Sequence, residues 1–344
     1  MKLGTIDVAD LGAWLRQAAQ ADELRFLSAE RLSGGAIQEN WALDLEFDGG
    51  PFAGMQELVV RTDAPSGVSV SHSREHEFAF LEAAFEAGVA VPEPLFLCSD
   101  ESVVGKPFYV MRRAAGTAIG QKIVKDPALG GDRDALTFRL GQELAKIHTI
   151  TPATHGFPFL SAPDPDPASQ AIAEFYGHLD ALGRPVPVLD WGLRWLQRHK
   201  PCRTEVVLAH HDFRTGNYMV DDNGLTAILD WEFAGWSDPH EDIAWFCAAC
   251  WRFGQRQLEA GGIGSREAFY AGYQDQSNRV IDPEAIYFWE VFAHVRWAVI
   301  AFQQGARHLE AGEDNLDLAL TGRRPPEMEM EILRMTEPGK GAAP

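Results

Sequence analysis

The chain of 344 residues is 46% hydrophobic and 23% charged, a composition typical of a soluble protein with room for two hydrophobic cores. It carries 50 acidic and 30 basic residues, for a net charge of -20, so most of its surface would repel a nucleic acid. The sequence has no run of about eighteen apolar residues and no apolar leader behind a basic flank. We therefore expect no nucleic-acid or membrane partner, and a cytoplasmic location.

The N-terminal part of the chain predicts a leading helix and then an antiparallel meander. Leu11, Trp14 and Leu15 recur at helical spacing, which predicts a surface helix. The runs ELRFLSAERL, WALDLEF and QELVVRT follow as three strands, because the turn-forming segments SGGAIQEN and DGG separate them.

A second helix and two more strands complete this region. Phe78, Leu81 and Phe85 form the apolar stripe of a helix that Gly88 ends. PLFLC and PFYVMRR then read as strands. Residues 1–113 are therefore predicted to form an N-terminal lobe of five strands with one helix inserted after the third, preceded by the leading helix.

The pattern becomes helical after the segment MRRAAGT. An apolar repeat with a period near four predicts a helix that runs into KIHTI, and short strands interrupt the helices around residues 205 to 231. Residues 284 to 308 carry aromatic side chains on several faces of a long helix, which indicates burial on more than one side. We expect a second lobe over residues 114–336 and a disordered tail over residues 337–344.

Two strand ends in the second lobe carry the residues with the clearest chemistry. The segment HHDFRTGN contains His210, Asp212 and Asn217, and Asp230 ends the apolar strand AILD further along the chain. Phosphoryl transfer needs a carboxylate that accepts the proton of the attacking hydroxyl, and oxygen ligands that hold Mg²⁺ against the phosphates. A loop of the form HxDxxxxN followed by a second aspartate supplies these groups in the required order.

On these motifs the chain resembles the aminoglycoside phosphotransferase family, whose members share the protein-kinase-like fold. The resemblance covers nearly the whole chain and includes PFYVMRR, ELAKIH, ILDWEFAGWSDPHEDIAWF and the C-terminal QGARHLEAGEDNLDLALTGRR. It is most marked with kinase-like domains related to those fused to acyl-CoA dehydrogenases. The resemblance implies a two-lobed α+β fold, with a five-stranded antiparallel sheet and one helix in the N-lobe and a mainly helical C-lobe.

The resemblance also implies a role for each residue of the two strand ends. Asp212 would be the catalytic base, and Asn217 and Asp230 would bind Mg²⁺. Arg214 would neutralise charge near the transferred phosphate, and His210 would brace the loop by hydrogen bonds. The family's aspartate is followed here by Trp231 and Glu232, which removes the expectation of a conformational flip at this motif.

The helix after this motif carries further acidic residues. Asp242 is expected to tie the backbone of the catalytic loop to the helix, as an equivalent aspartate does in kinases. Asp238 reads as a helix cap, and Glu241 as part of a solvated face. The pair Cys247 and Cys250 lies in an aromatic-rich run without a second pair of metal ligands, which favours buried structural thiols over a zinc or redox site.

The nucleotide is expected at the N-lobe. Gly34 and Gly35 lie where the family keeps its phosphate-covering loop, and their small size lets backbone N–H groups approach a polyphosphate. Arg61 stands on the third strand where a kinase carries lysine, and a guanidinium can grip phosphate through two N–H groups.

The ion-pair partner of Arg61 should come from the second helix. Glu77 lies in line with the apolar stripe of that helix, whereas Glu75 falls farther round it, so Glu77 is the predicted partner. The adenine is expected to meet backbone groups around Val110 and Arg112, just before the lobes join.

Together these features predict an enzyme that moves the γ-phosphoryl group of ATP or GTP to a hydroxyl of a small molecule, with Mg²⁺ as cofactor. Arg296 or Arg307 in an aromatic setting would suit an acidic acceptor, such as a hydroxy acid or a hydroxyacyl-CoA. The acceptor pocket is expected around these residues: Trp236, Trp245, Trp251, Trp289, Arg296 and Trp297.

Three alternatives remain open at this stage. An aminoglycoside or other antibiotic kinase would share the nucleotide motifs and differ in the acceptor pocket. A catalytically inactive, ligand-binding kinase-like module would not require Asp212, Asn217 and Asp230. A metal-dependent hydrolase built on HHD would need further histidine or aspartate ligands, whereas an amide and a carboxylate suit Mg²⁺ better than zinc. The sequence does not determine the number of subunits.

Overall fold

The computed structural model describes residues 2–3, 6–32, 38–63, 71–162, 164–202 and 205–338. The chain divides into two compact units. The first unit comprises Met1–Thr117 together with Thr226–Ala234, and the second comprises Ala118–Leu225 together with Gly235–Pro344. The boundary between the lobes was predicted after residue 113, and the first unit in fact extends to Thr117. The first unit also includes Thr226–Ala234, which carries Asp230, and this was not predicted.

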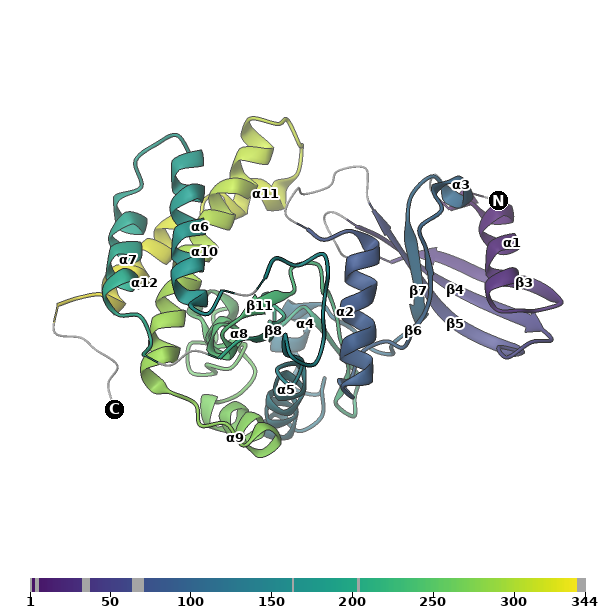
Figure 1. Ribbon diagram of the computed structural model, residues 1–344, viewed down its shortest axis with the longest axis horizontal. Coiled ribbons are helices and arrows are strands. Elements are labelled where there is room, and N and C mark those ends of the chain that lie inside the picture. Colours follow the sequence, from purple (N-terminus) through teal and green to yellow (C-terminus); the bar gives the residue numbers. More distant parts are fainter. Residues whose placement is uncertain are drawn as a thin grey trace. The chain divides into compact units, whose positions relative to one another are not determined.

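The first unit is built on an antiparallel sheet of five strands (Figure 1). The sheet order is β3-β4-β5-β7-β6, so the first three strands form the predicted meander and β7 lies between β5 and β6. The strands are β3 (Glu23–Arg31), β4 (Gln38–Asp48), β5 (Gly54–Asp63), β6 (Pro94–Cys98) and β7 (Phe108–Arg112). This architecture confirms the predicted five-stranded sheet.

Three helices accompany the sheet. They are α1 (Val8–Ala18), α2 (Arg74–Glu86) and α3 (Glu101–Val104), and two short strands, β1 (Lys2–Leu3) and β2 (Ile6–Asp7), precede them. Helix α1 is the predicted leading helix, and its Leu11 and Leu15 are fully buried against the sheet core. Helix α2 lies in the chain between the third and fourth strands of the sheet, as expected, and ends just before Gly88.

The second unit is mainly helical, in agreement with the predicted α+β class. Its helices are α4 (Gly120–Lys125), α5 (Arg133–Ile147), α6 (Pro167–Ala181), α7 (Pro187–Arg198), α8 (Pro239–Cys247), the short η1 (Ala249–Trp251), α9 (Arg266–Ser277), α10 (Pro283–Leu309), α11 (Leu316–Thr321) and α12 (Pro325–Met335). Its short strands are β8 (Val207–Ala209), β9 (Tyr218–Val220) and β11 (Gly235–Ser237), and β10 (Leu225–Ile228) begins where the chain passes to the first unit.

Helix α10 is the central helix of the second unit. Its length and composition would allow it to cross a membrane, but 78% of its most apolar window is buried inside the protein. Buried residues occur on all sides of the helix, including Phe288, Trp289 and Phe292, and they pack against α6, α7, α8 and α12. The expected burial of this segment on more than one side is therefore confirmed, and the helix serves as a core element.

Candidate active site

The loop that follows β8 is held by a single carboxylate. Asp242 on α8 accepts the backbone N–H of His210 at 2.6 Å through Oδ2 and the N–H of His211 at 2.8 Å through Oδ1. His211 has a φ of +61°, a left-handed conformation that is costly for a side chain of this kind and persists only where surrounding contacts impose it. The predicted tie between Asp242 and the loop is present, and it fixes the backbone immediately before Asp212.

Three side-chain donors converge on the carboxylate of Asp212. Arg214 Nε lies 3.0 Å from Oδ1 and 3.1 Å from Oδ2, and the indole N–H of Trp245 donates to Oδ1 at 3.0 Å. Asn217 Nδ2 donates both to Oδ2 and, at 2.9 Å, to the backbone carbonyl of Asp212. These hydrogen bonds fix the orientation of the carboxylate, and a positioned carboxylate is what general-base chemistry requires.

His210 lies behind this carboxylate. Its side chain is fully buried, and its Nδ1 accepts the backbone N–H of Asp212 at 3.3 Å. This geometry supports the bracing role expected of His210.

The anchor Asp242 is completely buried and has a depressed pKa. Burial alone would raise the pKa of Asp242, but the hydrogen bond and charge of His148, whose Nε2 lies 3.2 Å from Oδ2, lower it to about 2. His148 in turn hydrogen-bonds the hydroxyl of Tyr273 through Nδ1 at 2.8 Å. Every oxygen of the anchor therefore has a donor.

Glu241 corrects one expectation from the sequence. Glu241 is buried instead of lying on a solvated face, and it pairs with His211 at 3.5 Å and with Arg296 at 3.2 Å. Burial would lower the pKa of His211, but the charge of Glu241 outweighs this effect and raises it. Asp238, by contrast, caps α8 as expected, because it accepts the N–H of His240 at 2.8 Å.

The two arginines considered for an acidic acceptor have different surroundings. The guanidinium of Arg296 lies 4.6 Å from the centre of the Trp245 ring, beside the indole that holds Asp212. Arg307 is instead engaged by both oxygens of Glu313, at 2.9 Å and 2.7 Å, in its own connecting segment. Arg296 therefore stacks on a residue that contacts Asp212, and Arg307 has a local structural partner.

In the first unit, Arg61 is the centre of a buried ion-pair network. Neighbouring residues on a strand face opposite ways, so Val60 joins the core beneath α1 while Arg61 faces α2. Arg61 Nη2 lies 2.7 Å from Glu77 Oε1 and 2.6 Å from Asp230 Oδ1, which confirms Glu77 as the ion-pair partner. Burial disfavours the charged guanidinium, yet the nearby acids keep the pKa of Arg61 well above its usual value.

A second arginine in this network escaped the sequence analysis. Arg74, at the start of α2, is almost fully buried and pairs with Glu77 and, at 3.0 Å, with Asp63. Its position three residues before Glu77 on the helix was the only available signal. Glu77 is therefore held from two sides.

Asn217 and Asp230 are the predicted magnesium ligands. Asn217 uses its Nδ2 for Asp212, so its carbonyl Oδ1, an oxygen of the type Mg²⁺ prefers, remains on the other side of the amide. The Asp230 side chain is 27% exposed, and its backbone adopts a φ of +71°. Within the described ranges no group of three or more His, Cys, Asp or Glu side chains could hold a metal alone. Each of the two residues therefore offers an oxygen of the type that Mg²⁺ binds.

The other residues predicted to contact the nucleotide are Gly34, Gly35, Val110 and Arg112. Gly34 and Gly35 lie outside the residues that the structure describes. Val110 belongs to β7, a strand flanked on both sides, where sheet partners take up the backbone groups. The backbone N–H of Arg112 donates to Glu93 at 2.9 Å, and that of Arg113 donates to Glu57 at 3.0 Å.

Both cysteines of the CxxC are buried and unpaired. Burial raises the pKa of the Cys247 thiol to about 12 and that of Cys250 well above its usual value, so neither thiol is poised to react. This outcome agrees with the structural role expected for the pair.

Comparisons with known proteins place this geometry in context. Residues 28–288 match the model of a family described as the phosphotransferase enzyme family. The chain is 33% identical over 204 residues to acyl-CoA dehydrogenase family member 10 of Mus musculus, a match that covers 56% of this chain. The match spans 18% of the mouse protein, so the chain corresponds to about a fifth of that relative's length.

Two solved structures show the same fold. A Ralstonia eutropha protein assigned to the aminoglycoside phosphotransferases has a TM-score of 0.74 at 22% identity, covering 96% of this chain and 98% of that one. A spectinomycin phosphotransferase, solved with ADP and spectinomycin, has a TM-score of 0.61 at 13% identity, covering 96% of this chain and 99% of that one. The kinase-like architecture expected from the sequence is therefore confirmed.

The buried state of Asp242 leads to a prediction about acid stability. Because the pKa of about 2 in the folded protein lies below the ordinary value of 3.8, ionised Asp242 contributes stability above pH 3.8 that is lost as the pH falls towards 2. We expect Asp242→Asn to lower the free energy of unfolding by about 2 kcal/mol at pH 7 and to flatten its fall below pH 4, as measured by urea denaturation. An acid limb as steep as that of the wild type would contradict this role.

Proposed function

We propose that this chain, which belongs to the phosphotransferase enzyme family, transfers the γ-phosphoryl group of ATP or GTP to a hydroxyl of an acidic small molecule. The observation that carries this proposal is the carboxylate of Asp212, which three side-chain donors hold in place. A phosphoryl-transfer enzyme needs such a carboxylate to accept the hydroxyl proton, and it supplies the rest of its catalysis by positioning and charge.

We assign the acceptor chemistry to the second unit. Asp212 would take the proton from the acceptor hydroxyl while that oxygen attacks the γ-phosphorus. Arg214 and Trp245 would keep the carboxylate oriented, since both donate to Oδ1. The proposed role of Arg214 thus shifts from contacting the phosphate to holding the base.

We assign the donor chemistry to the first unit and the metal ligands. Arg61 would bind the α- and β-phosphates through the N–H groups that Glu77 leaves available, and burial of Glu77 would keep the guanidinium in place. Bound Mg²⁺ would neutralise charge on the phosphates, and Asn217 Oδ1 and Asp230 would hold it. Gly34 and Gly35 remain the proposed phosphate-covering loop.

The proposed base contact differs from the one expected from the sequence. Interior strand pairing makes Val110 unsuitable, and the N–H groups of Arg112 and Arg113 serve neighbouring strands. We therefore move the proposed donor to the adenine to Ala114, the next position along the chain, and keep the carbonyl of Arg112 as the proposed acceptor.

An acidic acceptor suits the surroundings of Asp212 better than an aminoglycoside. Two guanidinium groups, those of Arg214 and Arg296, lie over indole rings beside the carboxylate. They would attract a carboxylate or phosphate and repel a polycation. A hydroxy acid or a hydroxyacyl-CoA is the proposed acceptor, and the mouse relative, an acyl-CoA dehydrogenase by name, is consistent with the second.

Removal of the proposed base gives the first test. We expect Asp212→Ala to reduce acceptor-dependent ADP release by roughly 10²–10⁴-fold, the range for a lost general base, while Mg²⁺·ADP still binds. The assay would screen hydroxy acids, their CoA thioesters and aminoglycosides with ATP and with GTP. An Asp212→Ala enzyme with undiminished turnover would exclude the assigned base, and a turnover confined to aminoglycosides would favour the antibiotic-kinase alternative.

Arginine substitutions test the acidic acceptor separately. We expect Arg296→Gln to raise KM for the acidic acceptor at least tenfold, because a charge-assisted hydrogen bond would be lost, with a smaller effect on kcat. Arg307→Gln is the matched control, since Glu313 already occupies that guanidinium, and its KM should equal that of the wild type. Equal effects of the two substitutions would argue against Arg296 as an acceptor contact.

A further inference from the structure

Each of the four cation–aromatic contacts found in the described part of the chain lies in the second unit. Arg296 lies over Trp245 at 4.6 Å and Arg214 over Trp251 at 4.5 Å. Arg324 lies over Trp297 at 5.4 Å and Arg184 over Phe302 at 4.3 Å. We call these eight residues the arginine track.

Three of the aromatic rings of the arginine track contact one another in series. The rings of Trp245 and Trp251 are 5.3 Å apart, and those of Trp251 and Trp297 stack at 5.5 Å with an interplanar angle of 15°. Trp297 and Phe302 are both on α10, five positions apart, or about 7.5 Å along the helix axis. The arginine track thus leads from the residues that hold Asp212 to the far part of α10.

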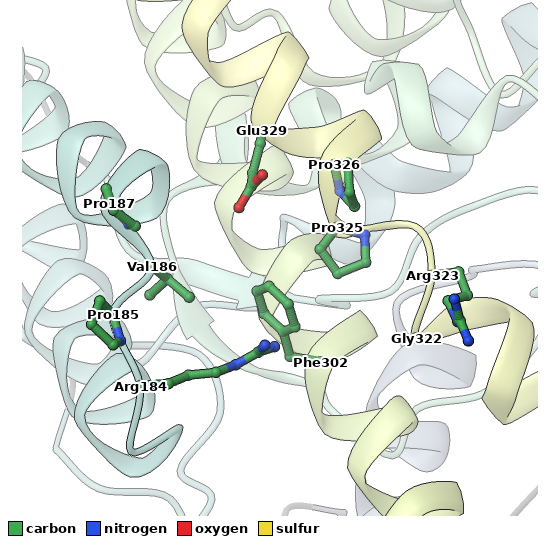
Figure 2. Close-up of a pocket in the computed structure, with 10 residues that line it drawn as sticks. All are labelled: Arg184, Pro185, Val186, Pro187, Phe302, Gly322, Arg323, Pro325, Pro326 and Glu329. Carbon is green, nitrogen blue, oxygen red and sulfur yellow. The ribbon is translucent and has the colours of Figure 1, made fainter.

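The arginine track ends at a pocket of about 350 Å³. Figure 2 shows Arg184 reaching from the connection between α6 and α7 towards the ring of Phe302, with Pro325 and Glu329 of α12 facing it. Arg323, next to Arg324 of the track, also lines the pocket. Its walls combine apolar side chains with the carboxylate of Glu329, and its cationic groups come from two separate segments of the chain.

The charges along the arginine track are not balanced evenly. Near the base, Arg214 is paired with Asp212 and Arg296 with Glu241, and farther along Arg324 is paired with Glu327. In the part of the chain that the structure describes, no carboxylate lies within ion-pair distance of Arg184 or Arg323, although the protein has a net charge of -20. An external anion would therefore gain most at the pocket end.

Stacking on an aromatic ring holds a guanidinium flat and leaves its N–H edge for an anion. Guanidinium groups bind phosphate through two parallel N–H groups. At Arg184 and Arg323, no carboxylate of the described residues forms an ion pair with these groups. We propose that the pocket binds the phosphate-bearing end of an elongated acceptor whose hydroxyl lies at Asp212. This inference rests on the proposed function and specifies its substrate class: a hydroxyacyl group carried on a long phosphorylated tail.

The test uses coenzyme A as a probe of the tail and pantetheine, the same chain without phosphates, as its matched control. The full-length protein is first saturated with Mg²⁺·ADP, so that the nucleotide part of coenzyme A does not enter the donor site. Titration calorimetry should then show that coenzyme A binds the wild type, and that Arg184→Gln with Arg323→Gln weakens this binding at least tenfold. Pantetheine should bind weakly and equally to both proteins.

A charge-matched control separates the pocket from the general field of the protein. Arg194→Gln with Arg334→Gln removes two arginines of α7 and α12 that pair locally with Asp190 and Glu331, so it should leave coenzyme A binding unchanged. An equal loss of coenzyme A binding in both double variants would show that net charge causes the effect. Undiminished coenzyme A binding by the variant with Arg184→Gln and Arg323→Gln would show that the tail binds elsewhere. Absence of coenzyme A binding in a protein that binds Mg²⁺·ADP would overturn the tail site and leave the phosphotransferase proposal standing. Failure to bind Mg²⁺·ADP would instead count against the proposed function.

Discussion

The second unit depends on the carboxylate of Asp242 and the two backbone N–H groups that it accepts. Without this anchor the chain after β8 would have no reason to enter the left-handed conformation of His211, and Asp212 would not meet its donors. The same helix supplies Trp245 to the base and Glu241 to Arg296. One short helix therefore positions the base and the first cation of the arginine track together.

A comparable constraint governs the first unit. Glu77 is buried between two arginines, and removing one of them would leave its carboxylate with half of its partners in a site without water, which is more costly than the pair is stabilising. Arg61 also contacts Asp230, on the segment Thr226–Ala234 that returns to this unit from the catalytic loop. We interpret this network as a device that keeps a phosphate-binding guanidinium in one orientation.

The residues recovered from the sequence are those whose spacing has a direct physical meaning. Asp212 and Asn217 share one loop, and Glu77 follows from the helical period, so local geometry was enough. Trp245 was expected at the acceptor pocket and not as a donor to Asp212, and Glu241 was expected on a solvated face, because a helical pattern does not tell which buried side chain meets a distant loop. Helix α8 is buried on most sides, so an amphipathic reading of Glu241 failed.

The sheet explains the other correction. The segment PFYVMRR was predicted to be the last strand of the N-lobe and to lead to the adenine, and β7 does end at Arg112. The strand order, which depends on pairing between segments far apart in the chain, puts β7 in the interior and takes up the backbone of Val110. Similarly, the return of Asp230 to the first unit depends on tertiary packing that no local pattern records.

The most direct test of the central claim is a thermal-shift titration with ATP, GTP and ADP, each with and without Mg²⁺, on the wild type and on Asp230→Ala. A nucleotide that binds the folded protein must raise the unfolding midpoint by mass action. The account predicts a Mg²⁺-dependent rise in the wild type with at least one nucleotide, and loss of that dependence in the variant. No shift at millimolar nucleotide, or an unchanged Mg²⁺ dependence in Asp230→Ala, would contradict it.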